Sequence, residues 1–249
     1  MSSTTNSETP ITQILHLTNN NIDNDTHLFS HPNFQSAIDQ CTSSPGFIRI
    51  YWGISLEHPS HLEIHIVRQT LSQHQTFLTS PNYQTFLTLI SAVTKTRQHE
   101  PIIRHAALRD FTPGSQALAR GAPFSGTAIY VNTSAAWHEG AWPLWTHIVR
   151  EVEGCLGCSG GEILEGRVES VRGRLGRKVK EEAEKEEFER CFVVYVGWAT
   201  EEAHHEYHGT KHFAEHSVVL RCGNEGYAEY GHVVFRGERV KEEVAAAKL

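Results

Sequence analysis

Histidine is the residue in this chain whose spacing most directly suggests chemistry. Four of the 17 histidines, His204, His208, His212 and His216, follow one another at four-residue intervals. On one continuous helix they would stack on a single face, an arrangement suited to a metal ion. Gly209 lies in the middle of the run and predicts that the helix breaks there. We therefore expect most of these rings to have a packing or capping role and one or two to line a pocket. No metal site is expected.

A second set of reactive side chains falls on a predicted hairpin. Apolar residues alternate in 47–54 and in 62–67. In an antiparallel pair, the residue numbers of opposite partners have a constant sum. The two apolar faces coincide only if that sum is even, near 116. Tyr51 then lies opposite or close to His65, with Arg49 on the same face. A neutral imidazole can take a proton beside a carbonyl, while tyrosine or arginine can stabilise the resulting oxyanion.

The second half of the chain offers a comparable set, so two groups of site residues are expected. The expected catalytic residues are His65, Tyr51, His204 and Tyr195. The expected substrate-binding residues are Arg49, His105, Gly157, Ser159, Trp198 and His232. A purely structural role for each of them remains the alternative.

Other chemistry-bearing motifs point away from cofactors. The C-L-G-C segment has C-x-x-C spacing, but it lies in a predicted strand without a second such pair, so buried thiols are expected. The sequence has no glycine-rich dinucleotide or phosphate loop, no nucleophile elbow and no H-E-x-x-H helix. No cofactor is therefore expected.

Composition restricts the partners and the compartment. The 29 acidic and 22 basic residues give a net charge of −7, which disfavours nucleic acid or an anionic membrane surface as the main partner. No apolar run approaches the roughly 20 residues of a membrane span, and the polar N-terminus has no signal-peptide core. Five cysteines, an odd number, suit a reducing compartment. We expect a cytoplasmic protein with a small-molecule partner, no nucleic acid and no membrane.

An internal repeat supplies the elements that position these residues. His74 matches His204 at a separation of 130 positions, whereas Glu57 matches Glu165 at 108. The 22-residue difference lies in a charged stretch that only the second copy carries. Two copies of this size predict two domains, residues 11–111 and 126–237, joined by a linker at 112–125 and with the insertion at 166–190.

Each copy is predicted to be strand, helix, strand, strand, helix, strand, the ferredoxin-like α+β plan. The fourth strand of the first copy is expected at 102–110 and the last strand of the second at 227–235, followed by a helical or frayed tail. Where the first copy has Arg49 and Tyr51, the second has Gly157 and Ser159. Glycine leaves space beside a strand, so the roomier cavity is expected in the second half.

The strand end G-W, the following T-E-E-A-H-H-E-Y-H and the break before His212-Phe213 resemble the antibiotic-biosynthesis-monooxygenase-like (ABM-like) family of dimeric α+β barrels. The first copy's L-S-Q-H-Q-T-F-L-T-S-P-N-Y-Q-T-F resembles the same stretch, with Arg68 in place of the tryptophan. The resemblance covers nearly the whole chain. It implies two ferredoxin-like domains that close as an intramolecular dimeric α+β barrel, a pseudo-dimer within one chain; a homodimer of the whole chain stays open.

The same resemblance implies small-molecule chemistry, because the family includes cofactor-free oxygenases of aromatic polyketides, cyclases and haem-degrading enzymes. The leading hypothesis is a cofactor-independent monooxygenase or cyclase that acts on an aromatic or polyketide-like metabolite of secondary metabolism. The alternatives are a noncatalytic small-molecule-binding or scaffold protein and a haem-binding or haem-degrading protein. Under the leading hypothesis, replacing His204 or Tyr195 impairs ligand binding and leaves thermal stability nearly unchanged.

Overall fold

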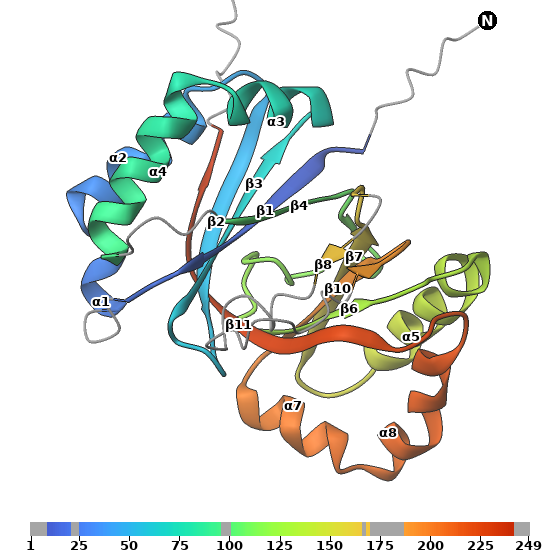
Figure 1. Cartoon of the computed structure of the whole chain (residues 1–249). Helices are drawn as coiled ribbons and strands as arrows, with labels where there is room; N and C mark the ends of the chain where they lie inside the picture. The colour runs from blue at the N-terminus through green and yellow to red at the C-terminus, as the bar shows by residue number, and fades with distance from the viewer. Residues whose placement is uncertain (1–8, 21–24, 96–100, 166–167, 170–186, 242–249) are drawn as a thin grey trace, which may run out of the picture.

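The structure, a computed structural model, describes residues 9–20, 25–95, 101–165, 168–169 and 187–241 (Figure 1). The main sheet consists of β1 (Ile11–Thr18), β2 (Phe47–Ser55), β3 (His61–Arg68), β4 (Ile102–Ala106), β5 (Arg109–Asp110), β6 (Phe124–Tyr130), β7 (Cys155–Glu162), β10 (Phe192–Trp198) and β11 (Tyr227–Val240). A separate pair is formed by β8 (Val168–Glu169) and β9 (Glu187–Phe188). The helices are α1 (Asp25–Leu28), α2 (Pro32–Thr42), α3 (Leu71–Leu78), α4 (Pro81–Thr94), a π-helix η2 (Trp137–Ala141), α5 (Trp142–Val149), α7 (Glu201–His208), α8 (Lys211–His216) and a 3₁₀-helix η3 (Ser217–Arg221).

The strand order shows the same pattern twice. The sheet runs β4-β1-β3-β2-β11-β6-β10-β7-β5, so the strands of each half are arranged fourth, first, third, second. The second strand of the first half, β2, pairs with the fourth strand of the second half, β11. At the opposite edge β5 pairs with β7, and Ala106 forms a bridge to Ile163. The curled antiparallel sheet thus closes on itself as an intramolecular dimeric α+β barrel, which confirms the predicted fold class.

Helices cover the outer faces of this sheet, as Figure 1 shows: α2, α3 and α4 lie over the first half, and α5, α7 and α8 over the second. The helices begin where the sequence provides caps. Thr70 forms a capping box with Gln73, and Ser80 and Thr200 accept hydrogen bonds from the backbone in the first turns of α4 and α7. Apolar residues of these helices and of the outward-facing strand positions form one core in each half, and a third core fills the barrel.

The predicted hairpin register is confirmed, because Tyr51 pairs with His65 and Ile50 with Ile66. Two other boundaries were wrong. The strand expected at 102–110 stops at Ala106 and resumes for two residues as β5. Residues 236–240 were expected to begin a helical or frayed tail. They form a strand instead, because β11 continues to Val240 and pairs with β2. That pairing satisfies backbone groups of β2 that would otherwise form an open sheet edge.

The chain that follows β4, rather than empty space, lies beside Gly157 and Gly161 of β7. A Cβ at Gly157 would lie 2.7 Å from Ser115 Cα, and one at Gly161 would lie 2.2 Å from the carbonyl oxygen of Ala107. Gly157 also has a φ of +120°, which disfavours any side chain. The expectation that these glycines open a cavity is therefore wrong: they allow the backbone after β4 to pack closely on the strand.

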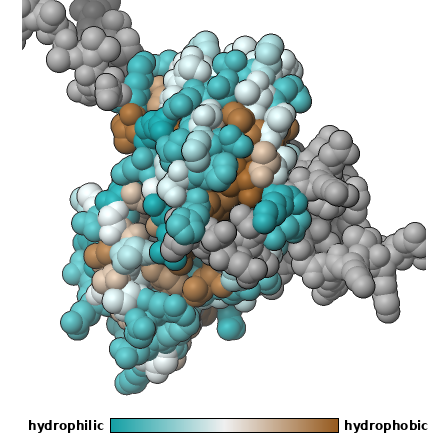
Figure 2. Space-filling view, turned by 90° about the vertical axis from the view of Figure 1, so that its left-hand side faces the viewer, coloured by the Kyte–Doolittle hydropathy of each residue, from teal (hydrophilic) through white to brown (hydrophobic). Residues whose placement is uncertain are grey.

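The remaining expectations for the chain concern its surface and the insertion. Of the charged segment 166–190, the structure describes only residues 168–169 and 187–190, so the rest lies outside the described residues, as do 242–249 of the tail. Among the helices of the described residues, none has the length and apolar character that crossing a membrane requires. The face in Figure 2 is mainly hydrophilic, with smaller hydrophobic patches in its upper and lower parts.

Candidate active site

The expected site residues fall on opposite faces of the sheet. In β10, Val194, Val196 and Trp198 face the helices, whereas Tyr195 points into the barrel. This follows from the two-residue period of a strand. The structure therefore divides the predicted residues into a barrel cluster and a group on the helix side.

The barrel cluster joins residues from both halves around Glu63. His65 Nε2 lies 2.5 Å from Glu63 Oε1, and the Tyr195 hydroxyl donates to the same oxygen at 3.1 Å. Tyr51 packs on His65 with ring centroids 4.6 Å apart. Burial opposes ionisation of Glu63, but the charge of His16 and the hydrogen bond from His65 outweigh it and lower the pKa to about 2. Burial and the Glu63 charge raise the pKa of Tyr195.

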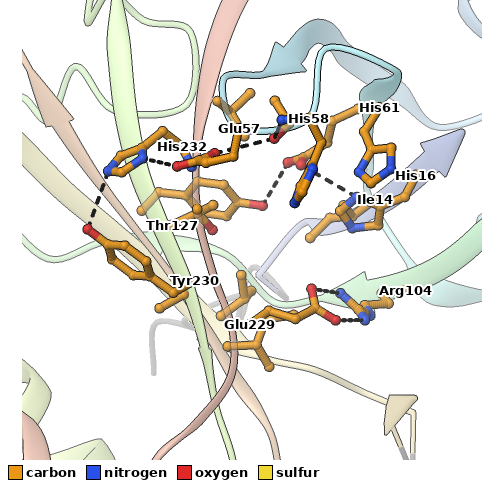
Figure 3. Close-up of a pocket in the computed structure, with 18 residues that line it drawn as sticks. Ile14, His16, Glu57, His58, His61, Arg104, Thr127, Glu229, Tyr230 and His232 are labelled. Atoms are coloured by element: carbon orange, nitrogen blue, oxygen red, sulfur yellow. Dashed lines mark hydrogen bonds and ion pairs between the residues drawn. The ribbon is translucent and has the colours of Figure 1, made fainter. Parts of the chain in front are cut away.

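Beside this cluster lies a small cavity lined by both polar and apolar side chains, drawn in Figure 3. Its volume is about 90 Å³. That is less than the roughly 150 Å³ that holds one benzene in an engineered protein cavity. Arg104 lines it, but both of its terminal nitrogens are engaged by Glu229, at 3.0 and 2.6 Å. The barrel cluster therefore lies where no ring system fits, and its charges are internally paired.

A cavity of about 370 Å³ lies in the second half, between the sheet and helices α5, α7 and α8. We call it the aromatic cavity. Its aromatic lining residues are Tyr130, Trp142, Trp145, Trp198, Tyr207, Phe213, Tyr227 and Tyr230. Its size and its apolar walls with few polar groups are typical of small-molecule sites.

A difference in helix length explains why the second half is roomier. In the first half, α4 spans 14 residues and buries Tyr83, Phe86 and Ile90 against the sheet. Its counterpart α8 has six α-helical residues before the chain tightens into the 3₁₀-helix η3, and neither element has a buried residue. The predicted position of the roomier cavity is thus correct, but the short helix creates it and the glycines of β7 do not.

Two histidines of α7 supply the titratable groups of the aromatic cavity. Helix α7 ends at His208 with Gly209 as its C-cap, so the four-histidine stripe is cut as predicted. His204 is 4% exposed, and its ring centroid lies 5.1 Å from Trp198 and 4.4 Å from His208. Burial, followed by the neighbouring histidines, lowers the pKa of His204 to about 3, so its ring is neutral at physiological pH. His208 also lines the cavity, but its side chain is exposed to solvent.

His232 approaches His204 from β11, with ring centroids 4.8 Å apart. Its Nδ1 contacts Glu57 Oε1, and its backbone N–H donates to Glu57 Oε2 at 3.0 Å (Figure 3). Burial works against ionisation of Glu57, but the side-chain and backbone hydrogen bonds from His232 outweigh it and lower the pKa to about 2. The carboxylate thus fixes the imidazole and leaves its Nε2 3.3 Å from the Tyr230 hydroxyl.

The two halves meet along two seams, β2 with β11 and β5 with β7. The repeat places an equivalent glutamate–histidine contact near the second seam. His105 Nδ1 lies 2.7 Å from Glu165 Oε1, and its ring lies 5.2 Å from that of His74. Each glutamate thus reaches across to a histidine of the other half. Sequence reasoning did not select Glu57 or Glu63 as site residues, although two signals were present. Glu57 matches Glu165 in the repeat, and Glu63 shares a strand face with His65.

The other expected substrate-binding residues lie away from the aromatic cavity. Arg49 pairs with Glu238 at 2.5 Å and donates to the Leu118 carbonyl at 3.0 Å. Ser159 donates to Asp110 at 2.7 Å beneath the linker, next to Gly157. Of the residues singled out from sequence, Trp198 and His204 line the aromatic cavity, and His232 adjoins it.

Comparisons with known proteins support the fold. No family model and no curated protein sequence matches the chain. An anthrone oxidase-like protein of solved structure is 11% identical and superposes with a TM-score of 0.60 over 97% of both chains. A candidate monooxygenase from Fusobacterium nucleatum gives 0.56 at 9% identity over 94% of this chain and 95% of that one. One from Lactobacillus acidophilus gives 0.55 at 14% identity over 94% and 97%.

These structures define the class: the chain has the fold of ABM-like dimeric α+β barrels, as the sequence resemblance implied. At such low identity the likeness is one of fold. The coverage of both chains shows that whole molecules superpose.

Proposed function

We propose that the protein is an enzyme that binds a planar aromatic or polyketide-like metabolite in the aromatic cavity and oxidises it with molecular oxygen. The observation that carries this proposal is the cavity itself, because about 370 Å³ of space is walled by aromatic rings and bordered by two imidazoles. Tryptophan and tyrosine faces favour stacking with a flat ring system. The anthrone oxidase-like and monooxygenase-like neighbours favour oxygenation over cyclisation.

The two histidines suit different parts of one proton transfer. His204 is buried and neutral, so it can donate a ring N–H to a substrate carbonyl and stabilise the oxyanion that forms on deprotonation. The same low pKa makes its protonation at pH 7 unfavourable, which disfavours it as the base. His208 reaches both the cavity and solvent, so it can take the carbon-bound proton and release it to water.

The reaction balances without a resident redox group. Deprotonation of an anthrone-type ketone gives an electron-rich oxyanion that can itself be oxidised by O₂. One ketone and one O₂ then give one quinone and one water, so the ring CH₂ becomes a carbonyl. Cyclisation would begin with the same proton removal and remains the second reaction compatible with this site.

The test combines binding and turnover with anthrone in chelator-treated buffer. Because Trp142, Trp145 and Trp198 line the cavity, anthraquinone is expected to quench tryptophan fluorescence. Val196→Phe fills the cavity and should weaken binding at least tenfold. The matched control, Val218→Phe, changes a side chain that is 59% exposed and should bind normally.

Turnover separates the hypotheses. His208→Gln should retain binding and slow oxygen consumption by about 10²-fold or more, the usual contribution of a general base. Binding without turnover in the native protein would support the noncatalytic binding alternative. A Soret band on addition of haemin, with no response to anthraquinone, would support the haem alternative. The proposal would be refuted if the protein neither bound anthraquinone nor bound haemin nor consumed oxygen with anthrone.

A further inference from the structure

We propose that His204, His205 and His232 form a binding site for a divalent transition-metal ion such as Zn²⁺ or Co²⁺. Within the part of the chain that the structure describes, these residues can each offer one ligand atom with all three atoms within 4.8 Å of one another. Three imidazoles are a common protein ligand set for Zn²⁺ and leave a fourth position open. The site differs from the four-histidine stripe, because His232 comes from β11.

The three rings converge from two elements. The ring centroids of His204 and His205 are 5.6 Å apart, and those of His205 and His232 are 5.8 Å apart. His204 Nδ1 is buried and has no hydrogen-bond partner among the described residues. A buried nitrogen without a partner is costly, so a ligand that accepts its lone pair would be stabilising.

Glu57 supplies the second feature of a metal-binding histidine. Metal-ligating imidazoles usually donate their other ring N–H to a carboxylate, which fixes the tautomer and raises ligand basicity. Glu57 contacts His232 Nδ1 in this way, so Nε2 carries the lone pair. Among the residues that the structure describes, the Tyr230 hydroxyl is a partner of Nε2 at 3.3 Å, a long hydrogen bond that a metal ion can replace.

Binding requires a small closure of the rings. Zn–N bonds of about 2.1 Å in a tetrahedral site place the nitrogens about 3.4 Å apart. The present separation of up to 4.8 Å must therefore shrink by up to about 1.4 Å, which side-chain rotation can supply. His205 is exposed, so its ring is the one that can turn without disturbing the core.

The first half contains a natural comparison. Its His74 and His105, with Glu165 from the second half, occupy the positions equivalent to His204, His232 and Glu57, but Gln75 replaces His205. His74 Nε2 also already bonds to the Ile11 carbonyl at 2.9 Å. The third ligand is therefore missing there, and we expect a single metal ion per chain.

The test uses untagged full-length protein titrated with Co²⁺, followed by visible absorption, and with Zn²⁺ by calorimetry. One ion per chain is expected. His205→Gln and His232→Gln should each weaken binding at least tenfold, and Glu57→Gln should weaken it about 10- to 100-fold, as loss of an outer carboxylate does. His147→Gln, an exposed histidine on α5, is the matched control and should bind as the native protein does.

His205→Gln also guards against misfolding, since an exposed side chain can be replaced without loss of packing. No Co²⁺ spectrum at tenfold excess of the ion, or equal binding by the His205 and His147 variants, would overturn the proposal. Because no organic ligand is present, this outcome is independent of whether the protein oxidises anthrone.

Discussion

At the scale of single residues, the structure separates titratable groups that the sequence placed together. Tyr195 and His65 meet around Glu63 inside the barrel, whereas His204 and His208 line the aromatic cavity. Reactive side-chain types thus occur on both faces of one sheet, but only one face leaves space for an organic ligand. The chemistry of a side chain therefore depends on which face it occupies.

Tyr195→Phe tests the barrel cluster. The change removes a buried hydrogen bond to the ionised Glu63, so the free energy of unfolding should fall by about 1–3 kcal/mol. Anthraquinone binding should stay unchanged, since the ring lies on the far face of the sheet from the cavity. Denaturant unfolding and fluorescence titration measure the two effects. Lost binding with intact stability would instead restore Tyr195 as a site residue.

Buried neutral histidines predict how stability depends on pH. Burial lowers the pKa of His16 to about 4 and that of His74 to about 3, both from an ordinary value of 6.5. The unfolded chain therefore binds protons that the folded chain does not as the pH falls below 6.5. Stability should be full above that pH and should decline between pH 6.5 and 4.5, by up to about 1.4 kcal/mol per pH unit for each histidine.

Unfolding in urea across this pH range measures the slope. His74→Gln should make it shallower, because it removes one of the buried histidines whose pKa is lowered. His147→Gln, at an exposed position, should leave the slope unchanged. An equal slope in the His74 variant and the native protein would contradict the assignment of the decline to buried histidines.

At the scale of elements, packing decided features that residue patterns left open. The backbone after β4 packs on Gly157 and Gly161 of β7, and the aromatic cavity arises because α8 is short. The edge of β2 is covered by the extension of β11 to Val240. In each case a neighbouring segment that is distant in sequence determines what the element does.

Gly161→Ala tests the close approach of the backbone between β4 and β5. A Cβ there would lie 2.2 Å from the Ala107 carbonyl oxygen, a distance that the backbone must move to avoid. We expect a loss of about 1–3 kcal/mol in the free energy of unfolding, as for other overpacked sites. Gly140→Ala is the control, because its Cβ would have no neighbour within 4 Å. Equal melting temperatures for the two variants would rule out a tight contact at Gly161.

At the scale of the whole molecule, the two halves share their sheet and part of their core. The strands β2 and β11 form one seam, and β5 and β7 form the other. The barrel core contains Ile14 and Tyr51 from the first half with Ile129 and Val193 from the second. The proposed domains at 11–111 and 126–237 are therefore expected to depend on one another for stability.

Calorimetry tests that dependence. A shared sheet and core predict one cooperative transition with equal calorimetric and van't Hoff enthalpies, even though the chain contains two repeats. Weakening one seam by Glu57→Gln should lower that single transition without splitting it. Two resolved transitions would show that the halves are independent units and would contradict the shared core.

The sequence by itself determined the repeat, the α+β plan and the hairpin register. These follow from local periodicity: alternation placed Tyr51 opposite His65, and Gly209 predicted the end of α7. Such features depend on neighbours within a few positions, which a single sequence displays directly. The match of Glu57 with Glu165 was also visible, although its meaning was not.

Only the tertiary structure decided which residues form a site. Whether glycines leave room depends on what packs against them, and here the linker fills the space at Gly157. The contact of Glu57 with His232 joins residues 175 positions apart, so no local pattern could predict it. Cavities and carboxylate–imidazole contacts are set by long-range packing, and for that reason the fold was predictable while the site was only partly so.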